Sequence, residues 1–501
     1  MALYQQLEDW RRVIETVERI IAAEPDPIRR SRYVYTVAQL YRDKEQDADR
    51  ALQLFEEALD ANPRLLEAFE RVNKILTQRK DWKSLERAFR RMVKRLQTAS
   101  ISDADLHFKL WHNLGLIYRD RLVEPNAAIE AFKMATQYKP DEAVERQILA
   151  ELYEATGQID SAVGEHCLVL AKDPLRVDPY RSLYKLYARQ GDADRTWCMS
   201  SALVFLKKAD DDERRFFEAN RGEGLPKIRA RLDNEHWVRN VFHKDDNLFV
   251  GKVFEMIAPA AAKARMNQLV GARQVPALDS KARQDATSTV TAVTTLRWAA
   301  DVLGVRAPDV YLREDEPNAF VCAGIAPPVS YVGQRVLSGA SPLEMAFLAG
   351  RHMAMHRGEH VIRTLFPTYL EIKVLFFAAL CIVRQDVEVD PSIEAAVKAT
   401  AADLERLIET REKENLRVVV QRFLEGGQVA DLKRWVQAVE FTSCRAGFLL
   451  CGDLDVARRM VLAEPTVAGD PSPQDKLREV MLFSVSDAYF GLRKTLGIAL
   501  V

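Results

Sequence analysis

Residues 111–140, WHNLGLIYRDRLVEPNAAIEAFKMATQYKP, decide the fold of the first half of the chain. Trp111, Leu114, Gly115 and Tyr118 recur at helical spacing, and an Ala-x3-Phe step and a proline follow them. Small residues such as Gly115 let two helices approach closely, while aromatic residues fill the space between neighbouring pairs. A proline ends the second helix because it cannot continue the hydrogen-bond ladder. The segment therefore predicts a pair of tightly packed helices.

Related segments recur in phase on both sides of this one. The next unit ends at Pro174, and 174 − 140 gives a period of 34 residues. Partial matches carry Ala51 with Phe55, Leu85 with Phe89, and Tyr180 with Tyr187. The pattern resembles the tetratricopeptide repeat, which implies an α-solenoid over residues 1–213 that binds a protein or peptide on its concave surface. The alternative is an irregular helical bundle with chance alanines.

The start of the chain looks like part of a repeat unit. Residues 10–24 resemble the second helix of a pair, which Pro25 and Pro27 stop. We therefore leave open whether further sequence precedes Met1.

Composition narrows the classes of function. The net charge of −1 gives no support to nucleic-acid binding, which normally needs a basic surplus. None of the six cysteines forms a CxxC motif, so we expect reduced thiols in a cytoplasmic protein. The N-terminus, MALYQQLEDWRRV, lacks the apolar core of a signal peptide. The longest apolar run, residues 374–383, is too short to span a membrane and predicts a buried helix.

The second half divides into two segments in this interpretation. Residues 214–285 form a charged helical connector, with helices expected near 247–269 and, beyond it, near 286–303. Residues 286–501 form a further domain. Overall we predict a mostly α protein.

Residues 341–360, SPLEMAFLAGRHMAMHRGEH, contain a candidate metal site. Ser341 and Glu344 predict a capping box, so a helix begins here. His352 and His356 lie four residues apart, which places both imidazoles on one face of that helix, where they can share a zinc ion. The segment departs by one residue from the HExxH zinc-peptidase motif, because Met353 occupies the position of the general base.

The surrounding residues resemble the M48 family of metallopeptidases over residues 287–463. Asn318, Ala319 and Phe320 match the "NAF" segment of that family, and VEFTSCRAG at residues 439–447 resembles its "EFxADRxG" helix. The resemblance implies an α+β, zincin-like domain. It assigns Glu440 as the third zinc ligand, and Asn318, Phe320, Tyr331 and Arg445 to a peptide edge or cleft. Residues 329–336 are expected to form an edge strand that pairs with an extended peptide.

Two departures from the family weaken the site. Methionine cannot act as a general base, whose loss typically costs about 10²- to 10⁴-fold in rate. Cys444 stands where the family has a supporting aspartate; it either supports the metal ligands or is itself a fourth ligand. His360 is expected to be an exposed histidine near the helix end. Whether zinc is bound stays open, since packed histidines without metal also explain the pair.

These observations predict a non-catalytic scaffold or adaptor, in which the repeats bind a protein and the second half is a pseudo-metallopeptidase. One alternative is a zinc-dependent peptidase that uses a base other than the usual glutamate. Another is a C-terminal half that binds no metal and only packs on the repeats.

Overall fold

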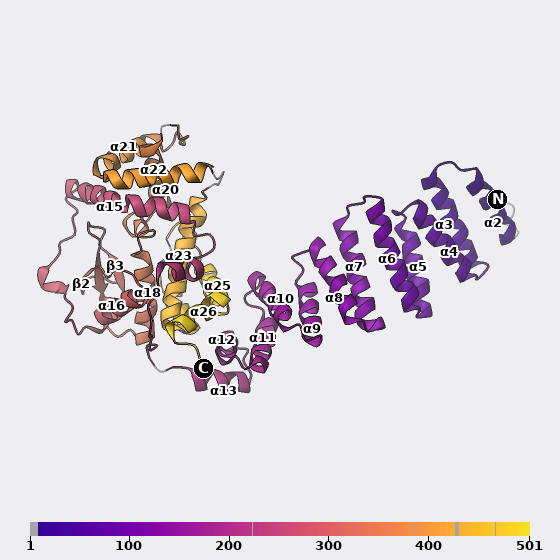
Figure 1. The fold of residues 1–501 in the computed structure, drawn as a ribbon, viewed down its shortest axis with the longest axis horizontal. Coiled ribbons are helices and arrows are strands. Elements are labelled where there is room, and N and C mark those ends of the chain that lie inside the picture. The colour runs from indigo at the N-terminus through magenta and orange to yellow at the C-terminus, as the bar shows by residue number, and fades with distance from the viewer. Residues whose placement is uncertain (1–8, 223, 385, 426–429, 466, 501) are drawn as a thin grey trace. The chain divides into compact units, whose positions relative to one another are not determined.

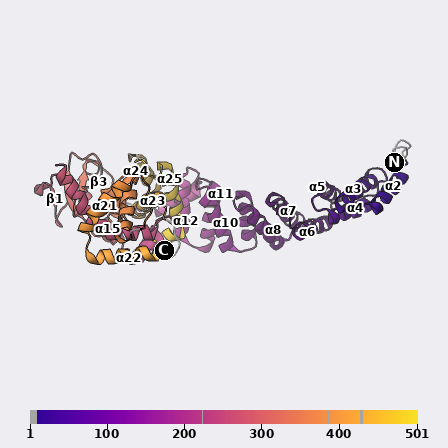
Figure 2. The same cartoon turned by 90° about the horizontal axis from the view of Figure 1, so that it is seen from above.

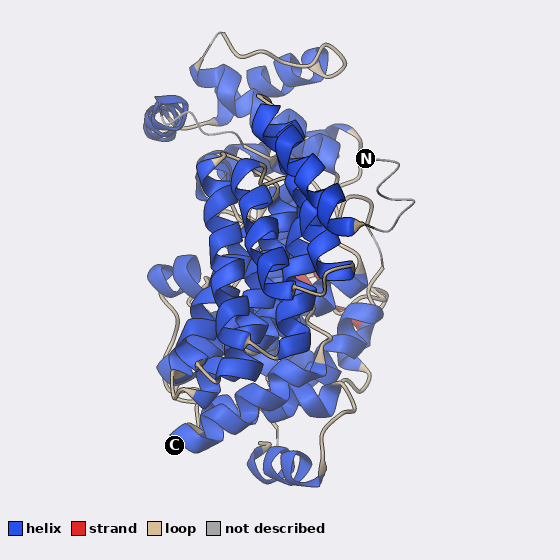
Figure 3. Ribbon diagram, turned by 90° about the vertical axis from the view of Figure 1, so that its right-hand side faces the viewer, coloured by secondary structure: helices blue, strands red, loops and turns tan. Residues whose placement is uncertain are grey.

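The chain is mostly helical. The computed structural model describes residues 9–222, 224–384, 386–425, 430–465 and 467–500. These residues form 25 α-helices and one small four-stranded sheet (Figures 1 and 3). The chain divides into unit 1, Met1–Lys172, and unit 2, Asp173–Val501. The predicted fold class, a mostly α protein with an N-terminal α-solenoid and a minor α+β part, is confirmed.

Unit 1 is a row of paired helices. In chain order it contains α2 (Trp10–Ala23), α3 (Pro27–Asp43), α4 (Ala48–Ala61), α5 (Leu66–Arg79), α6 (Trp82–Thr98), α7 (Ala104–Ile117), the π-helical segment η1 (Tyr118–Leu122), α8 (Pro125–Tyr138), α9 (Ala143–Ala155) and α10 (Ile159–Lys172). Consecutive helices lie side by side along the unit in both views (Figures 1 and 2). Aspartate side chains cap several of these helices, including α4 at Asp47 and α6 at Asp81, by accepting backbone amide hydrogens.

A close contact in unit 1 joins α7 to α8. Gly115 and Ala128 are both buried, and the ring of Phe132 lies against Gly115. A Cβ atom at Gly115 would lie 2.7 Å from Cε2 of Phe132. The expectation that a small residue permits close approach of the two helices is therefore confirmed.

Unit 2 begins with three helices that the repeat pattern had assigned in part to the solenoid. They are α11 (Val177–Gln190), α12 (Ala193–Phe205) and α13 (Asp211–Asn220). The guanidinium of Arg493 in α26 (Asp487–Leu496) lies 2.7 Å from the Asp194 carboxylate of α12, and both side chains are buried. This ion pair ties α12 to the C-terminal end of the chain. The boundaries predicted at residues 213 and 285 stay predictions.

The rest of unit 2 surrounds the sheet with helices. Its elements are α14 (Asn234–His236), the π-helical η2 (Trp237–Val241), α15 (Leu248–Gly271), the 3-10 turn η3 (Ser280–Ala282), β1 (Arg283–Gln284), α16 (Thr291–Val302), β2 (Asp309–Arg313), β3 (Phe320–Cys322), β4 (Val329–Gly333), α17 (Gln334–Leu337), α18 (Pro342–Met355), α19 (Ile362–Leu365), α20 (Tyr369–Val383), α21 (Glu394–Leu407), α22 (Thr410–Glu425), α23 (Leu432–Cys451), α24 (Leu454–Leu462) and α25 (Pro473–Ser484).

The strand predicted at the sheet edge lies inside the sheet. The strand order is β1-β2-β4-β3, and β4 pairs in parallel with β2 and antiparallel with β3. All five residues of β4 are buried, as expected for an interior strand, and residues 334–337 form α17. The predicted edge strand over 329–336 was therefore wrong. β3, which carries Phe320, occupies that edge.

Two apolar helices form a second core in unit 2. The helix predicted near 247–269 is α15, and the apolar run 374–383 lies in α20; both contribute buried residues to one cluster. The helix expected near 286–303 is α16, which begins only at Thr291. Among the described residues, no helix combines the length and apolar character needed to cross a membrane.

We predict that Gly115→Ala lowers the free energy of unfolding by about 1–2 kcal/mol. Overpacking against Phe132 costs about 1–3 kcal/mol, which exceeds the helix gain of about 0.5–1 kcal/mol from replacing glycine. Urea unfolding followed by far-ultraviolet circular dichroism measures the change. Gly164→Ala in α10 is the control, because a Cβ there meets no atom within 4 Å. It should stabilise, and equal effects of the two changes would contradict the close contact.

Candidate functional site

Helix α18 carries the candidate site and lies against α23. Its N-terminus is fixed by the predicted capping box, in which the Ser341 hydroxyl and the Glu344 carboxylate each accept a backbone amide hydrogen. Glycines at the crossing let the two helices touch. A Cβ at Gly350 would lie 2.8 Å from the Ala446 carbonyl oxygen, and one at Gly447 would lie 2.7 Å from the Phe347 carbonyl oxygen. This contact places the histidines of α18 toward the sheet.

The two predicted histidine ligands converge on one point. Their Nε2 atoms are 3.1 Å apart. The hydroxyl oxygen of Ser330, in β4, lies 2.7 Å from Nε2 of His352 and 3.2 Å from Nε2 of His356. Burial, together with the neighbouring charge of His356, holds the pKa of His352 well below its ordinary 6.5, and burial lowers the pKa of His356 to about 4. Both rings are therefore neutral at neutral pH.

The position predicted for a general base lies in the protein core. Met353 in α18 is fully buried. The other nearby carboxylates already have partners. Glu344 serves the cap and contacts Arg459 at 3.2 Å, and Glu359 pairs with Arg357 at 2.9 Å. None of these groups is a free base beside the histidines.

Glu440 in α23, the predicted third ligand, belongs to a buried ion cluster. Its Oε2 atom accepts hydrogen bonds from Nη2 of Arg351 at 2.8 Å and from Nζ of Lys476 at 2.9 Å. Arg351 also contacts Glu464. Burial alone would raise the pKa of Glu440, but the charges of Lys476 and Arg351 outweigh it and hold this pKa below its ordinary value. The carboxylate is ionised and committed to two cations.

The residues do not fit a three-ligand zinc site. The two neutral imidazoles suit a metal, but the third predicted ligand is neutralised by Arg351 and Lys476, whose positive charges would oppose a nearby cation. Among the described residues, no three His, Cys, Asp or Glu side chains form a group that could hold a metal ion.

Of the remaining predicted site residues, some line a cavity beside His352 and others are packed inside unit 2. Asn318 and Phe320 line a cavity of ≈ 290 Å³ that also contacts His352. Cys444 is buried, and burial raises the pKa of its thiol to about 11, so it is protonated. Tyr331 is buried in β4 with the guanidinium of Arg313 over its ring at 4.8 Å. It therefore belongs to the sheet and not to an open surface.

Arg445 holds elements of unit 2 together. Its Nε donates to Oε1 of Glu479 in α25 at 2.7 Å, and its Nη1 donates to the Phe242 carbonyl at 2.8 Å. The imidazole of His243 lies 3.5 Å from the other oxygen of Glu479. The guanidinium thus links α23 to α25 and to the segment after η2.

His360 is buried, so the expectation of an exposed histidine was wrong. Helix α18 ends at Met355, and the chain turns inward. Nε2 of His360 lies 2.9 Å from the carboxylate of Asp246, which also accepts a hydrogen bond from Thr442 at 3.0 Å. Asp246 comes from the segment predicted as a connector, 114 residues away in sequence, so no local pattern pointed to it.

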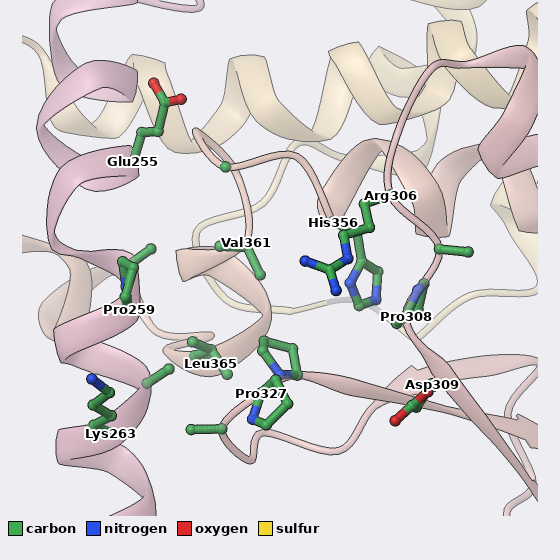
Figure 4. A pocket seen from close by; sticks show the side chains of 16 residues that line it. Glu255, Pro259, Lys263, Arg306, Pro308, Asp309, Pro327, His356, Val361 and Leu365 are labelled. Atoms are coloured by element: carbon green, nitrogen blue, oxygen red, sulfur yellow. The ribbon is translucent and has the colours of Figure 1, made fainter. Parts of the chain in front are cut away.

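A second cavity, a cleft of ≈ 650 Å³, is bordered by His356, whereas the cavity with Asn318 and Phe320 is bordered by His352 (Figure 4). Helix α15 forms one wall with Pro259 and Lys263, and Arg306 lies on the opposite side. Its two acidic residues are paired, Glu255 with Lys252 at 2.5 Å and Asp309 with Arg283 at 3.2 Å. Within the described part of the chain, Lys263 and Arg306 have no carboxylate partner, so the free charge of the cleft is positive.

Comparison with known proteins finds similarity to solved helical-repeat structures. No family model matches the sequence, and no curated protein matches it. Part of the chain is similar to YrrB, described as a TPR protein with an unusual peptide-binding site, at 16% identity over 37% of this chain and 91% of that one, with a TM-score of 0.26. The C-terminal part of a TPR repeat-containing protein from Cytophaga hutchinsonii is 12% identical over 43% of this chain and 97% of that one, with a TM-score of 0.27. A thermophilic TPR protein of Thermus thermophilus is 21% identical over 38% of this chain and 97% of that one, with a TM-score of 0.20. At these scores the similarity assigns no partner or activity to this chain.

We predict that Arg445→Met lowers the free energy of unfolding by about 3–5 kcal/mol, because it leaves the buried Glu479 carboxylate without its cation. Urea unfolding measures the loss. Arg434→Met on the same helix is the matched control. Its side chain is 71% exposed, and its surface pair with Asp431 contributes at most about 1 kcal/mol. If Arg445→Met cost no more than this control, Arg445 would not have the structural role assigned to it.

We also predict a pH-dependent contribution from Glu479. Burial raises its pKa, but the hydrogen bond with His243 and the charge of Arg445 outweigh burial and keep the pKa below its ordinary 4.5. The stabilisation is therefore present above about pH 4.5 and is lost as pH falls through the lower pKa of the folded state. Glu479→Gln should lose less stability than wild type between about pH 5 and pH 3. If the free energies of unfolding of wild type and Glu479→Gln, measured with urea, fell in parallel over this pH window, the assigned role of Glu479 would be refuted.

Proposed function

We propose that the chain is a non-catalytic protein-binding protein. In this proposal the helical repeats hold a protein or peptide partner, and the second half is a metallopeptidase-like domain that has lost its chemistry. The observation that carries the proposal is the state of Glu440. Its carboxylate oxygen is held by Arg351 and Lys476 and faces two cations in place of a metal.

The missing base supports the same conclusion. Hydrolysis by a metal-bound water needs a group that accepts its proton, and Met353 has no such group. Glu344 and Glu359 are engaged in a helix cap and an ion pair. A peptide that reached the histidine pair would therefore meet neutral imidazoles and the Ser330 hydroxyl, but no carboxylate that is free to act.

The outer faces of the helix pairs and the cleft beside His356 are suited to binding without cleavage. Stacked helix pairs bury their apolar faces against each other and leave extended outer faces for a partner. In unit 2, the cleft beside His356 has a volume of ≈ 650 Å³, within the usual range for ligand sites, and four prolines line it. A short extended peptide is the ligand that such a cleft accommodates.

The second candidate is a zinc-dependent peptidase that uses another base. One observation favours it: the Nε2 atoms of two neutral histidines lie 3.1 Å apart and point to the same place. In that case His352 and His356 would hold the ion, which would supply a Lewis acid for peptide hydrolysis. The proposal needs a base that the described residues do not offer at this position.

We predict no chelator-sensitive peptide cleavage by the purified full-length protein. Labelled casein and a mixed peptide library are incubated with the protein and added zinc, with and without EDTA, beside an active zinc peptidase as positive control. Wild type and His352→Ala should give the same background. Turnover that EDTA abolishes and that His352→Ala lacks would overturn the proposal and establish the second candidate.

The metal content of protein purified without a metal-affinity tag separates the remaining cases. Zinc that is present in wild type and lost in His356→Ala, without any cleavage, would mean a surviving ion site in a non-catalytic domain. Zinc-free protein in both cases would mean that the histidine pair is a packed part of the fold.

A further inference from the structure

Helix α6 in unit 1 is strongly basic. It carries six basic residues and one acidic residue, although the whole chain has a net charge of −1. A groove of ≈ 640 Å³ lies along this helix and is lined by Arg87, Arg90, Arg91, Lys94 and the indole of Trp111 from α7, with Val93 and Gln97. No acidic residue is among these lining residues.

Two acidic residues beside the groove are shared between its arginines and partners outside it. Glu56 in α4 accepts a hydrogen bond from Arg95 at 2.6 Å and has Arg91 at 3.6 Å. Glu86 accepts a hydrogen bond from the Tyr118 hydroxyl at 2.6 Å and has Arg90 at 3.4 Å. Asp105 at the start of α7 pairs with Lys139. These carboxylates therefore leave part of the positive charge of the groove unbalanced.

Two cations of the groove make no ion pair or hydrogen bond with a carboxylate. Within the described part of the chain, Arg87 donates hydrogen bonds to the Ser84 hydroxyl and the Lys83 carbonyl, and its charge acts on Asp81 only at longer range, whereas Lys94 has no hydrogen-bond or ion-pair partner. Both side chains are exposed. They lie seven residues apart on one helix, a distance of about 10 Å along its axis.

We infer that this α6 groove is a docking site for an acidic segment of the protein partner. An acidic helix with carboxylates at positions i, i+4 and i+7 repeats the spacing of Arg87, Arg91 and Lys94 over the same distance of about 10 Å. The half-buried indole of Trp111 supplies apolar contact for the body of such a segment. The identity of the occupant as protein rests on the proposed function.

A nucleic acid fits the groove less well. A phosphate backbone needs a continuous track of cations that neutralises many charges, whereas this track covers about two helical turns and Glu86 lies at its border. Each surface ion pair contributes little by itself, so recognition depends on several pairs acting together and on moderate salt.

The test is fluorescence anisotropy with the full-length protein and a fluorescein-labelled peptide of about ten glutamates. We expect saturable binding that weakens steeply with added sodium chloride. The double variant Arg87→Glu/Lys94→Glu should bind at least about tenfold more weakly. The milder Arg87→Gln/Lys94→Gln should fall between it and wild type. Circular dichroism confirms that each variant is folded.

The control reverses two other exposed cations of unit 1, in Arg64→Glu/Lys74→Glu. It changes the net charge by the same amount outside the groove and should alter affinity by no more than about twofold. Equal losses in both double variants would mean that the peptide senses overall charge and would overturn the site. Absence of binding to wild type, or tighter binding of a single-stranded oligonucleotide that competes for the groove, would overturn the acidic-peptide assignment.

These outcomes are independent of the cleavage experiment. Chelator-sensitive turnover with intact acidic-peptide binding would refute the proposed function and leave the groove standing. Absence of turnover together with unchanged binding in the groove variants would refute the groove and leave the proposed function standing.

Discussion

The close crossing of α18 and α23 is the constraint on which the candidate site depends. With no side chain at Gly350 and Gly447, the two backbones approach to distances that a Cβ atom would prevent. The crossing sets the rotation of α18, so that His352 and His356 face Ser330 in β4 while the neighbouring Arg351 reaches Glu440 on α23. One helix contact therefore decides which side chains meet and which do not.

The charges that this contact brings together are balanced within the protein. Arg351 and Lys476 face Glu440 and Glu464, two cations against two anions, in a place where unpaired charge is costly. A carboxylate that serves as a metal ligand must direct its oxygen at the ion. Here that oxygen completes an internal ion cluster, and the packing of α18, α23 and α25 depends on it.

Local features of the sequence were predictable, and non-local ones were not. The helix pair at residues 111–140, the capping box at Ser341 and the shared face of His352 and His356 all follow from spacings of three or four residues. The partners of Glu440 and His360 do not. Lys476 lies 36 residues from Glu440, and Asp246 lies 114 residues from His360, so only the fold brings them together. The place of β4 had a local signal that the family resemblance obscured, because VSYVG at residues 329–333 is a nearly continuous apolar run, typical of an interior strand.

The methionine at position 353 and the ion cluster at Glu440 have the same physical consequence. A fully buried methionine contributes about 1.5–3 kcal/mol of apolar burial, whereas an unpaired carboxylate in its place would have to be desolvated. Likewise, Glu440 lowers its cost of burial by pairing with Arg351 and Lys476. At both positions the side chain stabilises the folded domain and leaves no free carboxylate beside the histidines.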